Sequence, residues 1–283
     1  MSVPWWRPSG PTAALDLVLT LIPQAERALI RAAHFAMPDL YPPTAALDPE
    51  LRWMADDLAQ SLGGWLVWVS RDATAMIRQA ARTIPPPDGA IASGVIPQPR
   101  GTFWFDADPL EVADVSEASP TVPLVGLTWT AAYEHITVDD PLRVAAVTVF
   151  PWAAGPEPFV GSPSTVPLAE DAARMIPTGS GVTISRDLAA VWDHPWADTI
   201  KLALAAWVMC GQILPQHIIS ATRAQRRRAG RLTTPPAPGW GDVHVTTLRR
   251  HAQGSDTTTP DDDEARYHHQ WIVSGHWRWQ PCG

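Results

Sequence analysis

The chain has 283 residues, of which 46% are hydrophobic, and its formal net charge is −8. This length allows one large domain or two ordinary ones, and the apolar content excludes a disordered protein. The two cysteines, Cys210 and Cys282, are too few and too far apart for a disulfide framework. Met1–Arg7 does not have the pattern of a signal peptide, and the apolar run 200–214 is too short to span a bilayer. The sequence therefore predicts a cytoplasmic protein without a membrane partner.

The charge is unevenly distributed along the chain. Residues 222–283 contain nine Arg against six Asp and Glu, whereas residues 1–221 contain 12 basic and 23 acidic residues. Lys201 is the single lysine, so nearly all basic residues are Arg. A high-GC coding bias explains this preference for Arg as well as a functional role does. An acidic body with a more basic C-terminal segment indicates a protein that meets an anionic partner through one end, and a solvated tail is the alternative.

Helical and strand-like patterns follow one another in runs along the chain, with helices first, then strands, then a helix, then strands. The predicted helices are 12–36, capped by Thr12 and divided at Pro23; 49–62, which follows Asp48 and is ended by Gly63-Gly64; 72–82, capped by Asp72; 168–175; and the apolar 196–214. The predicted strands are 65–69, which could instead continue the preceding helix, 102–105, 124–136, 142–150, 182–184 and 243–248. Strands 124–136 and 142–150 are predicted to pair, joined by the turn 137–141. This order predicts an α+β fold with N-terminal helices, a mostly antiparallel central sheet, an apolar helix packed on it and a C-terminal strand pair.

The composition changes near residue 220. We predict an acidic α+β body over residues 1–219 and an Arg/Pro-rich linker over residues 220–242. Residues 243–283 are predicted to form C-terminal strands that pack on the body.

The basic residues of the C-terminal part form the main candidate binding surface for RNA or another partner. The candidate residues combine guanidinium groups, which bind phosphates, with rings that stack on unpaired bases. They are Arg223, Arg226, Arg227, Arg228, Arg231, Arg249, Arg250, His276, Trp277 and Arg278. The alternative is that the Trp residues belong to the core and the Arg residues form a solvated face.

No motif of a nucleotide-, zinc- or serine-dependent enzyme occurs in the sequence, and we expect neither a cofactor nor a bound metal. His268 and His276 are the candidates for a general base and a general acid in metal-independent RNA cleavage. They could instead ligate a metal with Cys282 or His244, or hydrogen-bond within a sheet. The sequence favours a non-enzymatic protein.

The last strand-like stretch ends in Gly275-His276-Trp277. Residues 267–281 resemble the C-terminal signature of a family of phage, plasmid and actinobacterial proteins that includes a type V-A anti-CRISPR protein. That member recognises the nascent N-terminal peptide of the CRISPR effector nuclease and promotes loss of its mRNA. Family members usually continue into a further basic strand, whereas this sequence stops at Gly283. A truncated form of a longer protein is one expected explanation of this difference.

The resemblance implies a mobile-element regulatory protein, with an anti-CRISPR-like action on translation or mRNA. Its expected partner is RNA, a ribosome-associated complex or a nascent peptide. The alternatives are a ribonuclease that uses His268 and His276, and an inhibitor module that docks a host protein through the acidic body. The sequence does not indicate an oligomeric state.

Overall fold

A computed structural model describes residues 8–36, 49–85, 95–107, 111–112, 122–134, 143–153, 159–160, 164–167, 183–184, 197–211, 216–234, 236–237 and 240–247. The helices are α1 (Pro11–Leu21), the short 3-10 helix η1 (Ile22–Gln24), α2 (Ala25–Ala36), α3 (Pro49–Leu62), α4 (Arg71–Thr83), α6 (Ala197–Gly211) and α7 (Arg223–Ala229). The strands are β1 (Trp65–Val69), β2 (Arg100–Phe105), β3 (Glu111–Val112), β4 (Val122–Glu134), β5 (Arg143–Ala153), β6 (Phe159–Val160), β7 (Ser164–Pro167), β8 (Thr183–Ile184), β9 (Gln216–Ser220) and β10 (Asp242–Thr246).

The strands form one mixed sheet in the order β8-β7-β5-β4-β2-β1-β10-β9, with β3 beside β4 and β6 beside β5. Among the described pairings, β1 is parallel to both β2 and β10, and β7 is parallel to β8. The other pairings are antiparallel, as in the long β4–β5 pair. The fold is therefore α+β with a mostly antiparallel sheet, as the sequence predicts.

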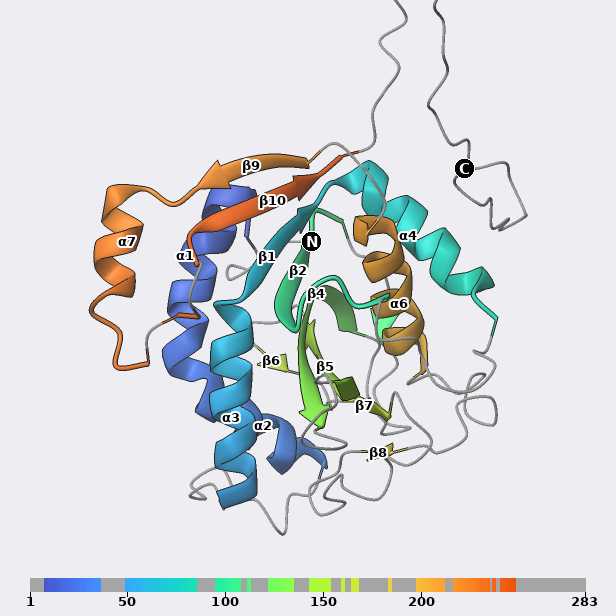
Figure 1. Ribbon diagram of the computed structural model, residues 1–283, viewed down its shortest axis with the longest axis horizontal. Helices are drawn as coiled ribbons and strands as arrows, with labels where there is room; N and C mark the ends of the chain where they lie inside the picture. Colours follow the sequence, from blue (N-terminus) through green and yellow to red (C-terminus); the bar gives the residue numbers. More distant parts are fainter. Residues whose placement is uncertain are drawn as a thin grey trace, which may run out of the picture. The chain divides into compact units, whose positions relative to one another are not determined.

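Helices cover both faces of this sheet. One hydrophobic cluster joins α1, α2 and α3 to the first face, and a second joins α4 and α6 to the opposite face (Figure 1). In β1, Leu66 and Trp68 belong to the first cluster, while Val67 and Val69 belong to the second. Successive side chains of a strand point to opposite faces, so a strand buried on both sides has an uninterrupted apolar sequence. The apolar run 65–69 is explained by this position between two helical layers.

Two glycines in the central strands make room for tryptophan rings. Gly101 of β2 is in register with Trp129 of β4, and Trp104 of β2 is in register with Gly126 of β4. A Cβ atom at Gly101 would lie 2.5 Å from Trp129, and one at Gly126 would lie 2.5 Å from Trp104. Trp129 and Trp104 are fully buried in opposite clusters. Each strand thus contributes one indole ring that covers the partner strand's glycine.

The structure confirms most of the predicted elements that lie within its described ranges. Pro23 divides the first helix through η1, α3 begins at Pro49 and precedes Gly63, and β4 pairs with β5. Two predicted caps are wrong. The residue before α1 is Gly10 rather than Thr12, and Ser70 rather than Asp72 caps α4, because the Ser70 side chain accepts a hydrogen bond from the Ala73 amide.

The segment predicted as a linker contains regular structure. Residues 223–229 form α7, and Ile219, Leu232 and Trp240 pack against the first hydrophobic cluster. β10 pairs with β9, a strand that the sequence analysis did not identify. The predicted helix 168–175 and the second strand of the C-terminal pair lie outside the described residues. The division of the chain at residues 219 and 242 stays a prediction.

Within the described ranges, none of the helices is long and apolar enough to cross a membrane.

Candidate nucleic-acid interface

Helix α7 begins at a capping box. The Thr222 hydroxyl accepts a hydrogen bond from the Gln225 amide at 3.3 Å, and the Gln225 side-chain oxygen accepts one from the Thr222 amide at 2.8 Å. This reciprocal pair satisfies two backbone donors that a helix start otherwise leaves unpaired. The Thr-x-x-Gln sequence thus fixes where this seven-residue helix begins.

One side of α7 packs on α1. Gln225 and Ala229 are buried there, one helical turn apart. The Gln225 side-chain nitrogen donates to the Thr12 carbonyl oxygen at 3.2 Å, and an Arg228 guanidinium nitrogen donates to the Thr20 hydroxyl at 2.9 Å. These two hydrogen bonds hold α7 against both ends of α1.

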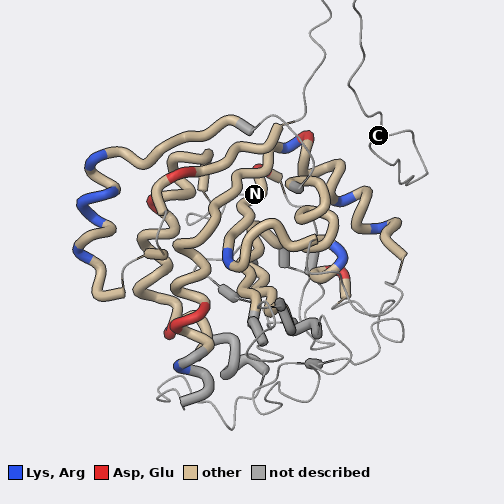
Figure 2. Tube along the Cα trace, viewed as in Figure 1, with Lys and Arg blue, Asp and Glu red and all other residues tan. Residues whose placement is uncertain are grey.

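The packing leaves Arg223, Arg226 and Arg227 on the outer side of α7. Arg227 lies two residues, or about 200° of helix rotation, from both buried positions, so it points away from α1. Arg223 lies about 40° from Arg227, and Arg226 and Arg228 flank it at about 100° on either side. Arg223, Arg226, Arg227, Arg228 and Arg231 are all exposed. Figure 2 shows these basic residues gathered along α7.

Three basic residues in the last turn also stabilise the helix itself, because cations interact favourably with the negative end of its dipole. The arrangement can neutralise several anionic groups of a partner. Of the residues predicted from the sequence, the structure brings together Arg223, Arg226, Arg227, Arg228 and Arg231. Arg249, Arg250, His268, His276, Trp277 and Arg278 lie outside the described residues.

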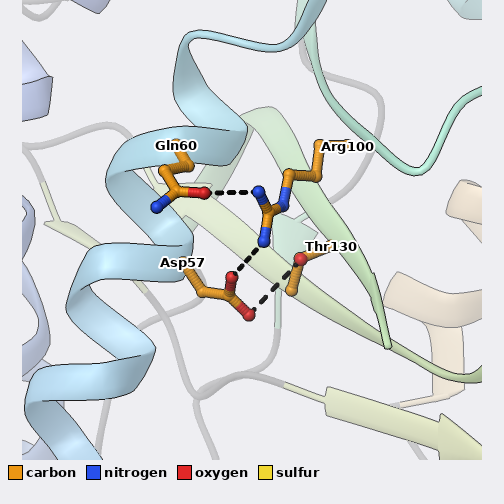
Figure 3. Close-up of polar contacts among 4 residues, drawn as sticks. All are labelled: Asp57, Gln60, Arg100 and Thr130. Atoms are coloured by element: carbon orange, nitrogen blue, oxygen red, sulfur yellow. Dashed lines mark hydrogen bonds and ion pairs between the residues drawn. The ribbon is translucent and has the colours of Figure 1, made fainter. Parts of the chain in front are cut away.

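A second polar cluster, which the sequence analysis missed, joins α3 to the sheet (Figure 3). An Arg100 guanidinium nitrogen lies 2.7 Å from Asp57 Oδ1, and its other terminal nitrogen donates to the Gln60 side-chain oxygen. The Thr130 hydroxyl donates to Asp57 Oδ2 at 3.4 Å. Asp57 and Gln60 lie one turn apart on α3, while Arg100 and Thr130 are in register on β2 and β4.

Burial raises the pKa of Asp57, while the nearby Arg100 charge acts to lower it. A carboxylate held by a guanidinium and a hydroxyl is an ion pair that links a helix to two strands. This geometry indicates a role in fixing α3 on the sheet.

His244 on β10 was an alternative metal ligand in the sequence analysis. Burial lowers the pKa of its imidazole, and the ring lies 5.6 Å from the Trp65 ring centroid to centroid. Within the part of the chain that the structure describes, no group of three or more His, Cys, Asp or Glu residues is placed to hold a metal ion.

Comparison with solved structures gives a weak structural likeness. No family model matches the chain, and no curated protein matches it. The structure is weakly similar to the crystal structure of AcrVA2, an anti-CRISPR protein, with 12% sequence identity and a TM-score of 0.34. The likeness covers 83% of each chain.

Proposed function

We propose that this chain is a non-enzymatic regulatory protein that binds RNA, alone or in a ribonucleoprotein, through the arginine face of α7. The observation that supports it is a helix fixed to α1 through Gln225 and Ala229, with Arg223, Arg226 and Arg227 on its outer side. Guanidinium groups pair with phosphate oxygens in a planar, bidentate geometry. A surface that is ordered before binding loses less conformational entropy when the partner arrives.

The regulatory setting of the proposal has a separate basis. A mobile-element protein with an anti-CRISPR-like action on mRNA or a nascent peptide is what the resemblance of residues 267–281 implies. The ribonuclease alternative is tested by RNA digestion with and without a chelator. If His276→Ala leaves such a cleavage activity unchanged, catalysis by His268 and His276 is excluded.

The RNA proposal is tested by the salt dependence of binding. Fluorescence anisotropy of a labelled single-stranded RNA is measured between about 50 and 200 mM salt, for the unmodified protein and for a variant with Arg223, Arg226 and Arg227 changed to Gln. Each phosphate that the protein neutralises contributes about 0.7 to the slope of log K against log salt for a single strand. Removing three guanidinium–phosphate pairs should therefore reduce the slope by about 2.

A matched control changes Arg71, Arg78 and Arg82 of α4 to Gln. These three side chains are exposed, like those of Arg223, Arg226 and Arg227. Replacing them with Gln changes the net charge by the same amount as the α7 variant does. They lie on the helical layer of the opposite sheet face. The α4 variant should bind RNA nearly as well as the unmodified protein. Equal loss of affinity in both triple variants, or no binding at low salt by the unmodified protein, rejects the proposal.

A further inference from the structure

β9 is the terminal strand of the sheet, and β10 is its partner among the described residues (Figure 1). Its sequence, Gln216-His217-Ile218-Ile219-Ser220, has no Pro, Lys, Asp or Glu. Native edge strands usually carry such residues, which prevent pairing with another chain. The β9 edge lacks this protection and remains compatible with one more strand.

The alternation of hydrogen bonds along β9 determines which of its backbone groups face away from β10. The Ala221 amide donates to the Gly241 carbonyl, and Ser220 is in register with Asp242. In an antiparallel pair, residues that bond to the neighbour alternate with residues that bond away from it. Ile219 and His217 therefore bond toward β10, while the amides and carbonyls of Gln216, Ile218 and Ser220 point outward. Ile218 is the middle of these three outward positions.

The side chain at this middle position is also unusual. Among the residues whose side chains are described, Ile218 is the large apolar residue left exposed, at 52%. It is in register with His244, which is partly buried. Its neighbour Ile219 packs against the core instead. The strand thus exposes one isoleucine at its centre, with polar residues at both ends.

We infer that β9 pairs with β9 of a second copy of this chain, antiparallel and about a two-fold axis at Ile218. In this register Ile218 lies opposite Ile218, and Gln216 lies opposite Ser220 of the other copy. All three outward-facing residues on each strand then form hydrogen-bonded pairs, and the two isoleucine side chains cover each other. Such an interface is isologous and closes after two copies.

The charge distribution favours this orientation. β9 contains no Asp, Glu, Lys or Arg, and the arginines of α7 begin three residues after its end. Antiparallel pairing places the two α7 helices at opposite ends of a strand pair about 17 Å long, which exceeds the Debye length of about 8 Å at physiological salt. Parallel pairing would bring the two arginine clusters side by side. The inference does not depend on RNA binding.

Sedimentation of the nuclease-treated full chain over a range of concentrations tests the association. We expect a reversible dimer, because a single added strand pair gives a small interface. Ile218→Lys should raise the dissociation constant at least about tenfold, since like charges directly opposite each other destabilise a strand pair. The control Gln79→Lys, on the exposed side of α4, should dimerise normally. A monomer at all concentrations up to about 1 mM, or a dimer unaffected by Ile218→Lys, overturns the inference.

Cysteine cross-linking tests the register independently, in a Cys282→Ser background. Cys210 is buried, which limits its interference. Ile218→Cys should form an intermolecular disulfide, because paired Cα atoms lie about 5.5 Å apart. Ser220→Cys should not, because two such residues would be about 13 Å apart along the strands. Equal cross-linking of both variants, or cross-linking of Ser220→Cys alone, overturns the proposed pairing. Binding of an unrelated peptide to β9 without dimerisation overturns it as well.

Discussion

Two opposing effects act on the pKa of Asp57, where α3 meets the sheet. Its carboxylate accepts from Arg100 and Thr130, which favours the charged form, while burial favours the neutral form. Burial is the larger effect, so the pKa in the folded protein lies above the ordinary value of 3.8. The folded protein therefore binds this proton more tightly than the unfolded chain does, and the associated stability is lost as the pH rises through the raised pKa.

Replacing Asp57 with Asn should remove this loss. We expect the unfolding free energy of Asp57→Asn, relative to that of the unmodified protein, to increase as the pH rises from about 3.5 to 7. The exchange of the neutral carboxyl group for an amide beside Arg100 and Thr130 adds a difference that does not depend on pH. Urea denaturation at a series of pH values measures both quantities. A difference that stays constant, or that decreases with rising pH, contradicts the account.

The same cluster also shows why sequence patterns did not reveal the contact between α3 and the sheet. Asp57 and Gln60 have the spacing of one helical face, and a pattern search finds them only as polar residues on an amphipathic helix. Arg100 lies 43 residues from Asp57, and Thr130 lies 73 residues from it. The register between β2 and β4 brings Arg100 and Thr130 together, and that register depends on the fold rather than on local spacing.

At the level of the element, α7 is short, and its cap and its packing should both be needed to keep it ordered. An isolated helix of this length is unstable in water. Thr222→Ala removes the hydroxyl that caps the Gln225 amide and should cost about 1 kcal/mol. Because α7 lies at the margin of the core, much of this cost should appear as local opening.

Hydrogen exchange followed by mass spectrometry measures that opening. Amides of residues 225–231 should exchange faster in Thr222→Ala, while amides of α6 should be unchanged. RNA affinity should fall less than in the variant without Arg223, Arg226 and Arg227, since the guanidinium groups remain. Uniformly faster exchange throughout the protein would show that the cap stabilises the whole fold and not this helix alone.

Elements with strong local signals were predictable from the sequence. The Pro49 start, the Gly63 stop and the apolar run 65–69 were each identified from a few adjacent residues. β9 was missed because it is a short strand between the α6 region and α7, and its two adjacent isoleucines do not alternate with polar residues. The Thr222 cap was hidden by the arginines that follow it, which suggested a charged linker.

At the scale of the whole molecule, both hydrophobic clusters are built from described residues between Ala14 and Val245. The chain divides into a compact unit, Met1–Arg249, and a second unit, Arg250–Gly283. The sequence predicted an α+β fold with its apolar helix on the sheet, but it did not predict a strand order. β1 lies between β2 and β10, which are parallel to it, and β10 is far from it in the sequence. Such long-range pairings have no local signature.

This division allows the contribution of the C-terminal residues to be measured separately. A chain that ends at Arg249 keeps both clusters, so its cooperative urea unfolding should have nearly the same slope as that of the full chain. If His276, Trp277 and Arg278 bind RNA as the sequence predicts, the truncation should lower affinity and reduce the salt slope by about 0.7 for each phosphate that is no longer neutralised. Combining the truncation with removal of Arg223, Arg226 and Arg227 should add the two effects in free energy if the surfaces act independently. Unchanged RNA binding after truncation would restrict the interface to the unit that contains α7.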